Sequence, residues 1–270
     1  MTPKKILIIG NGYLADNLLF SIKDRHNVTV YARNKYIEYN NVTYIYGSIE
    51  NLDCIKNNFD NVFILSGISR PNKLSLLHEV IYANVFLVAK VLDFATQTNA
   101  KIFYPASSLA LSNATNKLNY YSYSHTIAID MIKQSNVRHT ICYLHNVYGN
   151  LTLLNKKNKM VIDNFIDCYY TNQPVTLINN GLQKRIFTHI TDVISYMIYS
   201  LNDINKEVNL IKNNIMYSIK EIADLLSLQT KFENNSLYSL DDPYILPIDE
   251  IGDWIESIDI KNWINTKIKI

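Results

Sequence analysis

A glycine-rich turn near the start of the chain has the residue types that bind phosphate. Gly10, Gly12 and Ala15 form a G-x-G-x-x-A pattern between an apolar run and the first helical pattern. Small residues there let the backbone approach a pyrophosphate, and the amides at the start of the following helix would face its charge. A merely structural tight turn is the alternative interpretation. The strand, turn and helix context favours dinucleotide binding, in which Tyr13 and Leu14 would also contact the cofactor.

The residues after the second apolar run bear on which dinucleotide would fit. An acid at this place holds the ribose 2′-hydroxyl of NAD, whereas a cation suits the 2′-phosphate of NADP. The segment from Tyr31 to Lys35 carries no carboxylate, and its Arg33 can offer planar, bidentate donors to phosphate. A solvated loop charge is the alternative interpretation of Arg33. The sequence favours NADP(H) over NAD(H), and Arg33, Asn34 and Ser66 are expected to contact it.

Apolar runs and helical patterns alternate along the first half of the chain. Residues 6–9 form a continuous apolar run, as expected of a strand that is buried on both faces. The longest helix is expected within residues 76–98. Further β-branched or aromatic runs lie at residues 28–31, 42–46, 62–65, 102–104 and 140–144. This alternation predicts an α/β fold with a doubly wound parallel Rossmann sheet.

Strand patterns become less regular after Gly149. Helical patterns remain at residues 160–170 and 192–201, and Ser218 with Glu221 forms a capping box that opens another helix. We expect residues 1–149 to form the NAD(P)-binding core. Residues 150–270 are expected to form mainly a small substrate-binding lobe, with some segments returning to the core.

Composition excludes several classes of function. At 270 residues and 48% hydrophobic, the chain can bury a substantial core. A net charge of +2 without a lysine or arginine block indicates neither a nucleic-acid partner nor a basic membrane-binding face. The chain shows no signal-peptide pattern and no apolar stretch of membrane-spanning length, so a cytoplasmic protein is expected. Its 3 cysteines lack metal-ligand spacing, and no metal site is predicted.

Several later segments carry a resemblance to a known family. Ser107 and Ser108 follow the fifth apolar run, and a tyrosine-rich stretch at residues 120–125 begins a helix. Residues 145–149 read H-N-V-Y-G, and residues 183–193 are similar to Q-x-R-D-F-x-H-V-x-D-V. In order and spacing, these segments and the glycine turn resemble the extended short-chain dehydrogenase/reductase family. Its members are NAD(P)-dependent sugar-nucleotide epimerases, dehydratases and 4-ketoreductases.

The resemblance implies catalytic roles for Ser108 and Tyr121. Ser108 would bind the carbonyl or hydroxyl oxygen of the substrate, and Tyr121 would pass the proton while hydride moves to or from the nicotinamide. The pairing is chemically reasonable, because a hydroxyl donor and a tyrosine acid/base can stabilise the alkoxide that develops during carbonyl reduction. The alternatives are a serine that satisfies loop backbone groups and a tyrosine that only packs.

His125 departs from the family pattern, which is Y-x-x-x-K. Only Tyr121 fits the tyrosine position, and the residue at its lysine position is His125. The family lysine supplies a positive charge that lowers the tyrosine pKa, and it also binds the nicotinamide ribose. His125 lies one helical turn beyond Tyr121 on the same side and can donate a hydrogen bond to the ribose. As a neutral imidazole it would activate Tyr121 less. Slow, acid-shifted or absent activity is expected, and a histidine that is solvated or only packs is the alternative.

The resemblance also implies a substrate site and partners. Asn146 and Arg185 would lie near the nucleotide diphosphate of a nucleotide-sugar substrate, where arginine can bind phosphate oxygens. A structural ion-pair role is the alternative for Arg185. The family often dimerises through the helix that bears Tyr121. A homodimer is therefore a further expectation, unless the apolar residues of that helix face the sheet.

The reaction type follows from what flanks Ser108. Dehydratases of the family carry an acidic pair after the catalytic hydroxyl, whereas Leu109 and Ala110 follow here, so dehydration is disfavoured. Arg33 and the missing acid favour an NADPH-dependent reductase of a nucleotide-linked 4-keto sugar. A nucleotide-sugar 4-epimerase is the second hypothesis. A family member that has lost catalysis with His125 and serves as a binding subunit is the third.

Overall fold

The computed structural model describes most of the chain. The described residues are 2–35, 38–68, 77–111, 120–149, 160–202, 206–210, 215–234 and 258–268. They fall into two compact units. Unit 1 comprises Met1–Tyr143 and Tyr196–Asn209, and unit 2 comprises Leu144–Ser195 and Leu210–Ile270. The predicted division between residues 149 and 150 stays a prediction.

Unit 1 is built on a seven-stranded sheet in the order β11-β6-β5-β4-β1-β2-β3. The strands are β1 (Lys5–Ile9), β2 (Asn27–Ala32), β3 (Val42–Tyr46), β4 (Asn61–Ile64), β5 (Lys101–Ser107), β6 (His139–Leu144) and β11 (Lys206–Asn209). β1 pairs in parallel with both β2 and β4, and β2–β3, β4–β5 and β6–β11 are also parallel pairs. The predicted doubly wound parallel sheet is confirmed. Each of the six predicted runs forms a strand of it.

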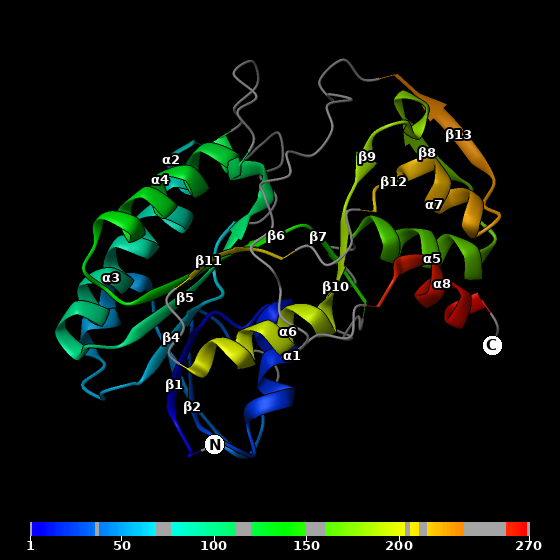
Figure 1. Ribbon diagram of the computed structural model, residues 1–270. Helices are drawn as coiled ribbons and strands as arrows, with labels where there is room; N and C mark the ends of the chain where they lie inside the picture. Colours follow the sequence, from blue (N-terminus) through cyan, green and yellow to red (C-terminus); the bar gives the residue numbers. More distant parts are fainter. Residues whose placement is uncertain are drawn as a thin grey trace. The chain divides into compact units, whose positions relative to one another are not determined.

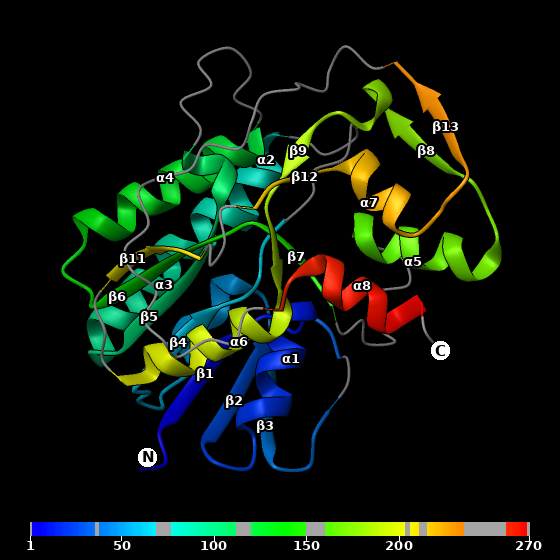
Figure 2. The ribbon, with the colours of Figure 1, turned by 45° about the vertical axis from the view of Figure 1, so that its right-hand side comes forward.

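Helices cover both faces of this sheet (Figures 1 and 2). α1 (Tyr13–Ile22) lies on one face, and α2 (Leu77–Ile81), α3 (Leu87–Thr98) and α4 (Tyr120–Gln134) lie on the other. A π-helical turn, η2 (Tyr82–Phe86), joins α2 to α3, so the long helix expected within residues 76–98 is interrupted. The short 3₁₀ turns of unit 1 are η1 (Ile49–Cys54), η3 (Ser108–Leu111) and η6 (Ser200–Asn202).

The main core of unit 1 lies between the sheet and α3 and α4. Successive strand side chains alternate between the two faces, so alternate residues of β5 point toward these helices. Ile102, Tyr104 and Ala106 belong to the same buried cluster as Leu87 of α3 and Ile129 of α4. This alternation therefore directs a tyrosine hydroxyl on β5 to the α4 side of the sheet.

Unit 2 is a mixture of helices and short strands. Its elements are β7 (Asn146–Tyr148), α5 (Val161–Thr171), β8 (Val175–Ile178), η5 (Asn179–Gly181), β9 (Lys184–Arg185), β10 (Phe187–His189), β12 (Tyr217–Ser218), α7 (Ile219–Leu225), β13 (Thr230–Glu233) and α8 (Ile260–Ile268). α6 (Ile190–Tyr199) begins in unit 2 and ends in unit 1. The predicted capping box is present: Ser218 Oγ accepts from the Glu221 amide at 3.0 Å, and Glu221 accepts from the Ser218 amide at 2.6 Å.

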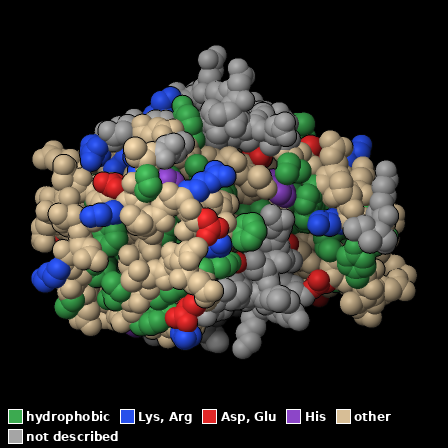
Figure 3. Space-filling model, turned by 90° about the horizontal axis from the view of Figure 1, so that it is seen from below, with side chains coloured by type: hydrophobic (Ala, Val, Ile, Leu, Met, Phe, Trp, Pro, Cys, Tyr) green, Lys and Arg blue, Asp and Glu red, His purple; other side chains and the backbone are tan. Residues whose placement is uncertain are grey.

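The surface carries charges of both signs. On the face shown in Figure 3, lysine and arginine side chains lie among acidic and uncharged ones. No helix among the described residues is long and apolar enough to cross a membrane.

Candidate functional site

The order of the strands places a ligand site at the ends of β1 and β4. Strand order reverses between these two neighbours, and in doubly wound sheets ligands bind outside the carboxyl ends of the strands at such a point. Gly10 follows β1, and a Cβ on it would lie 2.6 Å from the carbonyl oxygen of Leu65 and 2.8 Å from the amide nitrogen of Ser66. Its φ is +111°. Glycine is therefore required, and the turn lies directly against the segment that contains Ser66.

Gly12 is small for a different reason. It is exposed and precedes α1, and a Cβ on it would meet no heavy atom within 4 Å. No described side chain caps the start of α1, and Tyr13 and Leu14, its first residues, are partly buried. Open space beside uncapped helix amides is what the pyrophosphate of a dinucleotide needs. The residues present fit such a cofactor.

The loop after β2 lies beside this turn. Asn11 Nδ2 donates to the carbonyl oxygen of Asn34 at 2.7 Å, which joins the glycine turn to the loop. Lys35 pairs with Glu38, their charged atoms 2.6 Å apart. Arg33 is exposed and forms no ion pair with a described residue. Of the two cations after β2, Arg33 is therefore the one available to an anionic ligand.

Ser108, Tyr121 and His125 lie on two elements of unit 1 that pack together. Ser108 begins η3 directly after β5, and η3 packs against α4. Tyr121 is in the first turn of α4 and His125 in the next, both partly buried. Their ring centroids are 4.7 Å apart at an interplanar angle of 77°. The predicted side-by-side arrangement of Tyr121 and His125 is therefore present.

His125 has a second partner that sequence reasoning missed. The hydroxyl of Tyr104 on β5 lies 2.7 Å from His125 Nδ1, and the two rings are 5.7 Å apart. Burial lowers the pKa of His125 from 6.5 to about 4, and burial also raises the pKa of Tyr104. Both side chains are therefore neutral at pH 7. The available sequence signal was a single hydroxyl within a buried strand shortly before Ser108.

Asn84, in the π-helical turn η2, is another residue the sequence did not single out. It is buried, and its Oδ1 accepts from the amide of Ile68 at 2.8 Å, in the segment after β4. Its Nδ2 donates to Ser124 Oγ at 2.9 Å, and Ser124 Oγ donates to the carbonyl of Tyr121 at 2.7 Å. Asn84 thus connects the segment after β4 to the first turn of α4.

The two predicted substrate residues lie on neighbouring segments of unit 2. Asn146 on β7 donates through Nδ2 to the carbonyl of Ile186 at 2.9 Å, and β7 pairs in parallel with β10. Arg185 on β9 is partly buried and donates to the carbonyl of Lys184 at 2.7 Å. The chain folds these two residues close to one another. Their contact with a nucleotide diphosphate stays a prediction.

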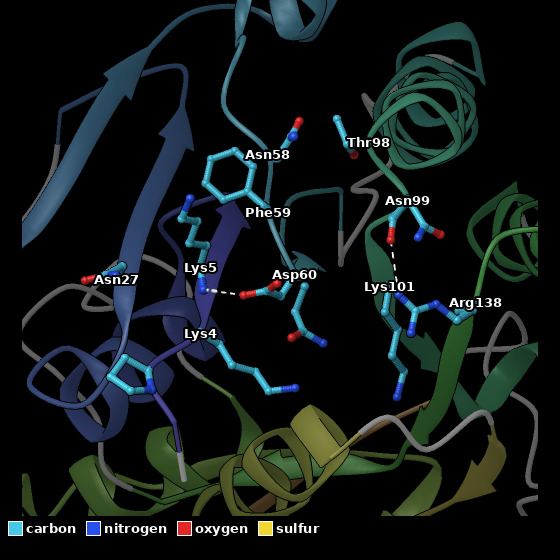
Figure 4. A pocket seen from close by; sticks show the side chains of 12 residues that line it. Lys4, Lys5, Asn27, Asn58, Phe59, Asp60, Thr98, Asn99, Lys101 and Arg138 are labelled. Atoms are coloured by element: carbon cyan, nitrogen blue, oxygen red, sulfur yellow. Dashed lines mark hydrogen bonds between the residues drawn. The ribbon is translucent and has the colours of Figure 1, made fainter.

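A polar hollow of about 480 Å³ in unit 1 lies at the amino ends of the strands, opposite the glycine turn (Figure 4). Lys5, Asn27, Asn61 and Lys101, which line it, all begin strands, so it opens at the amino ends. The ammonium of Lys101 donates to the carbonyl of Ser200 at 2.9 Å, at the carboxyl end of α6. This lysine therefore caps the carboxyl end of a helix. The hollow lies at the other end of the strands from the point where the strand order reverses.

A family model supports the assignment made from these residues. The model of the NAD dependent epimerase/dehydratase family matches residues 6–215 of the chain. The chain belongs to the NAD dependent epimerase/dehydratase family. The resemblance to extended short-chain dehydrogenases is thereby confirmed. No curated protein matches the chain.

Solved structures of similar fold include epimerases that act on nucleotide-linked sugars. A UDP-N-acetylglucosamine 4-epimerase from Methanobrevibacter ruminantium is 16% identical, with a TM-score of 0.84 over 100% of this chain and 97% of its own. An ADP-L-glycero-D-manno-heptose-6-epimerase from Helicobacter pylori is 19% identical, with a TM-score of 0.83 over 99% and 96%. A UDP-glucuronic acid 4-epimerase from Bacillus cereus, solved with NAD, is 16% identical, with a TM-score of 0.81 over 98% of each chain.

Proposed function

We propose that this chain is an NADPH-dependent reductase of a nucleotide-linked 4-keto sugar. The observation that carries the proposal is the ring contact between Tyr121 and His125 on α4, which packs against the turn that begins with Ser108. The two elements that carry the Tyr121 phenol and the Ser108 hydroxyl therefore pack together in the unit that also holds the Gly10 turn, which supports the proposal. These are the groups that reduction of a carbonyl requires from a protein.

Each site residue has a distinct task in this proposal. When bound, the nicotinamide supplies the hydride. The hydroxyl of Ser108 donates a hydrogen bond to the oxygen of the substrate carbonyl, and the phenol of Tyr121 donates the proton that this oxygen gains. His125, neutral because burial lowers its pKa to about 4, donates an N–H to the ribose and brings no charge to Tyr121.

The exposed guanidinium of Arg33 supports the choice of NADPH. Lys35 is paired with Glu38, whereas Arg33 forms no ion pair with a described residue, and no carboxylate lies between residues 31 and 35. A free, planar cation beside the glycine turn suits a 2′-phosphate. In unit 2, Asn146 and Arg185 would hold the diphosphate of the sugar nucleotide, with arginine as the bidentate donor.

A nucleotide-sugar 4-epimerase is the second candidate. Two of the similar folds are named as 4-epimerases, and one of these was solved with NAD. The same serine and tyrosine would serve this reaction, but the cofactor would be reoxidised on the enzyme. Net consumption of NADPH separates the two candidates.

The test is turnover by the purified protein with a panel of nucleotide-linked 4-keto sugars and NADPH or NADH. We expect loss of reduced-nicotinamide absorbance and a reduced sugar with at least one member of the panel. Tyr121→Phe should lower turnover by about a hundredfold or more while sparing NADPH binding, because it removes only the hydroxyl. Tyr123→Phe, on an exposed tyrosine of the same helix, is the matched control and should leave turnover unchanged. Equal rates for Tyr121→Phe and Tyr123→Phe would refute the catalytic assignment.

A further inference from the structure

His125, at the position where the family carries a lysine, pairs with the buried Tyr104. The Tyr104 hydroxyl and His125 Nδ1 are 2.7 Å apart and join strand β5 to helix α4. Tyr104 itself is only 4% exposed. The imidazole ring also contacts the ring of Tyr121, so it lies between the two tyrosines.

The direction of this hydrogen bond follows from the surroundings of the phenol. Tyr104 forms no other side-chain hydrogen bond with a described residue, so its buried hydrogen has Nδ1 as its acceptor. If Nδ1 carried the proton instead, the phenol hydrogen would be left buried without a partner, which is costly. Tyr104 therefore donates, Nδ1 accepts, and the single proton of the neutral imidazole lies on Nε2.

Burial supports the neutral state of both partners. Burial is the only cause that shifts the pKa of His125, which falls to about 4, so no described charge near the ring offsets it. The pKa of Tyr104 is raised by burial and further by Tyr121 and by Tyr143 on β6. Around the imidazole, Tyr104 on β5 and Tyr121 on α4 are the tyrosines that contact the ring.

We propose that Tyr104 is a positioning residue that fixes His125 as a neutral Nε2–H donor directed at the ribose of the nicotinamide cofactor. The ligand role of His125 rests on the proposed function, whereas the tautomer does not. In this arrangement the pair replaces only one of the two tasks of the family lysine. It supplies a hydrogen bond to ribose but no positive charge. Tyr104 also limits rotation of the imidazole and, through it, the ring of Tyr121.

The tautomer can be measured without cofactor or substrate. Nitrogen-15 NMR of histidine-labelled wild-type protein at pH 7 should show His125 with a protonated Nε2 and an unprotonated Nδ1. The resonance is assigned by its absence from His125→Gln. In Tyr104→Phe, which removes only the hydroxyl, the His125 signals should shift toward a mixture of both tautomers. Tyr143→Phe is the matched control: it removes a buried hydroxyl from the neighbouring strand, where Tyr143 donates to Glu207, and should leave the His125 signals in place.

Cofactor binding then tests which nitrogen of His125 donates to the ribose. Glutamine can place its amide nitrogen near the position of Nε2, and asparagine near that of Nδ1, so His125→Gln should bind NADPH more tightly than His125→Asn. Tyr104→Phe should weaken NADPH binding by about threefold to tenfold, the usual effect of one hydrogen bond.

Two results would overturn the proposal. One is a protonated Nδ1 or an imidazolium at His125 in the wild-type protein at pH 7, a measurement that does not depend on the folding of any variant. The other is NADPH binding that is equal in the wild-type protein, Tyr104→Phe, His125→Gln and His125→Asn. Failure of the proposed reaction is recognised separately, because turnover would then be absent while the tautomer and the binding series remain as expected.

Discussion

The two glycines of the first turn allow stability and cofactor binding to be separated. Gly10 has a φ of +111°, and a Cβ on it would lie 2.6 Å from the Leu65 carbonyl oxygen. Gly12 faces open space, and its φ of −84° is accessible to any residue. An added methyl group should therefore damage the fold at Gly10 and the cofactor site at Gly12.

The expected magnitudes differ clearly. A positive φ costs an alanine about 1–2 kcal/mol, and the clash with backbone atoms adds about 1–3 kcal/mol. Gly10→Ala should therefore lower the free energy of unfolding by about 2–5 kcal/mol and the melting temperature by roughly 5–15 °C. Gly12→Ala changes a residue at a helix N-cap and should cost less than about 1 kcal/mol. Its methyl group would lie where a pyrophosphate approaches, so NADPH binding should weaken about tenfold or more.

Urea denaturation and calorimetric titration with NADPH measure the two effects separately. Wild-type affinity in Gly12→Ala would contradict a pyrophosphate at this turn. Wild-type stability in Gly10→Ala would contradict the close approach of the turn to the segment after β4.

Three further predictions follow from the charges and histidines. Arg33→Ala should narrow the preference for NADPH over NADH, and calorimetry that finds NADH preferred by the wild-type protein would contradict the cofactor assignment. Arg185→Ala should weaken sugar-nucleotide binding and leave NADPH binding nearly intact, whereas Lys184→Ala, on an exposed neighbour, should change neither. An equal loss of affinity for both ligands in Arg185→Ala would indicate a structural role. Burial lowers the pKa of His125 and of His189 from 6.5 to about 4. Below pH 6.5 the unfolded chain therefore binds protons at these histidines that the folded chain does not bind. The free energy of unfolding should be highest above about pH 6.5 and should fall by up to about 2 kcal/mol per histidine by pH 5. Urea denaturation that finds equal free energies of unfolding at pH 7.5 and pH 5 would contradict the burial of these rings.

Sequence patterns predicted the inner strands of the sheet well because strands such as β1, β2 and β4 are almost entirely buried. A run such as residues 6–9 reads as continuously apolar, and the glycine turn after it needs only local geometry to be recognised. The strands that were not predicted are short or lie at an edge. β9 and β12 have two residues each, too few for any period to show, and β11 returns to the edge of the sheet beside β6 from far along the chain.

The candidate site was predictable where it depends on local order and not where it depends on packing. Tyr121 and His125 share a helical face, so their spacing alone predicts their contact. Tyr104 lies on a different element, and its contact with His125 depends on how α4 packs against β5. The bridge from Asn84 to Ser124 likewise joins η2 to α4, which only the folded chain brings together.

Transfer of deuterium tests the central claim most directly. The purified protein is incubated with NADPH that carries deuterium at the transferable position of the nicotinamide and with a panel of nucleotide-linked 4-keto sugars. The account predicts a product with one deuterium on sugar carbon 4, together with one NADPH consumed for each sugar reduced. Tyr121→Phe should form this product about a hundredfold or more slowly than the wild-type protein. If the protein binds NADPH but transfers deuterium to none of the sugars in the panel, the account is contradicted.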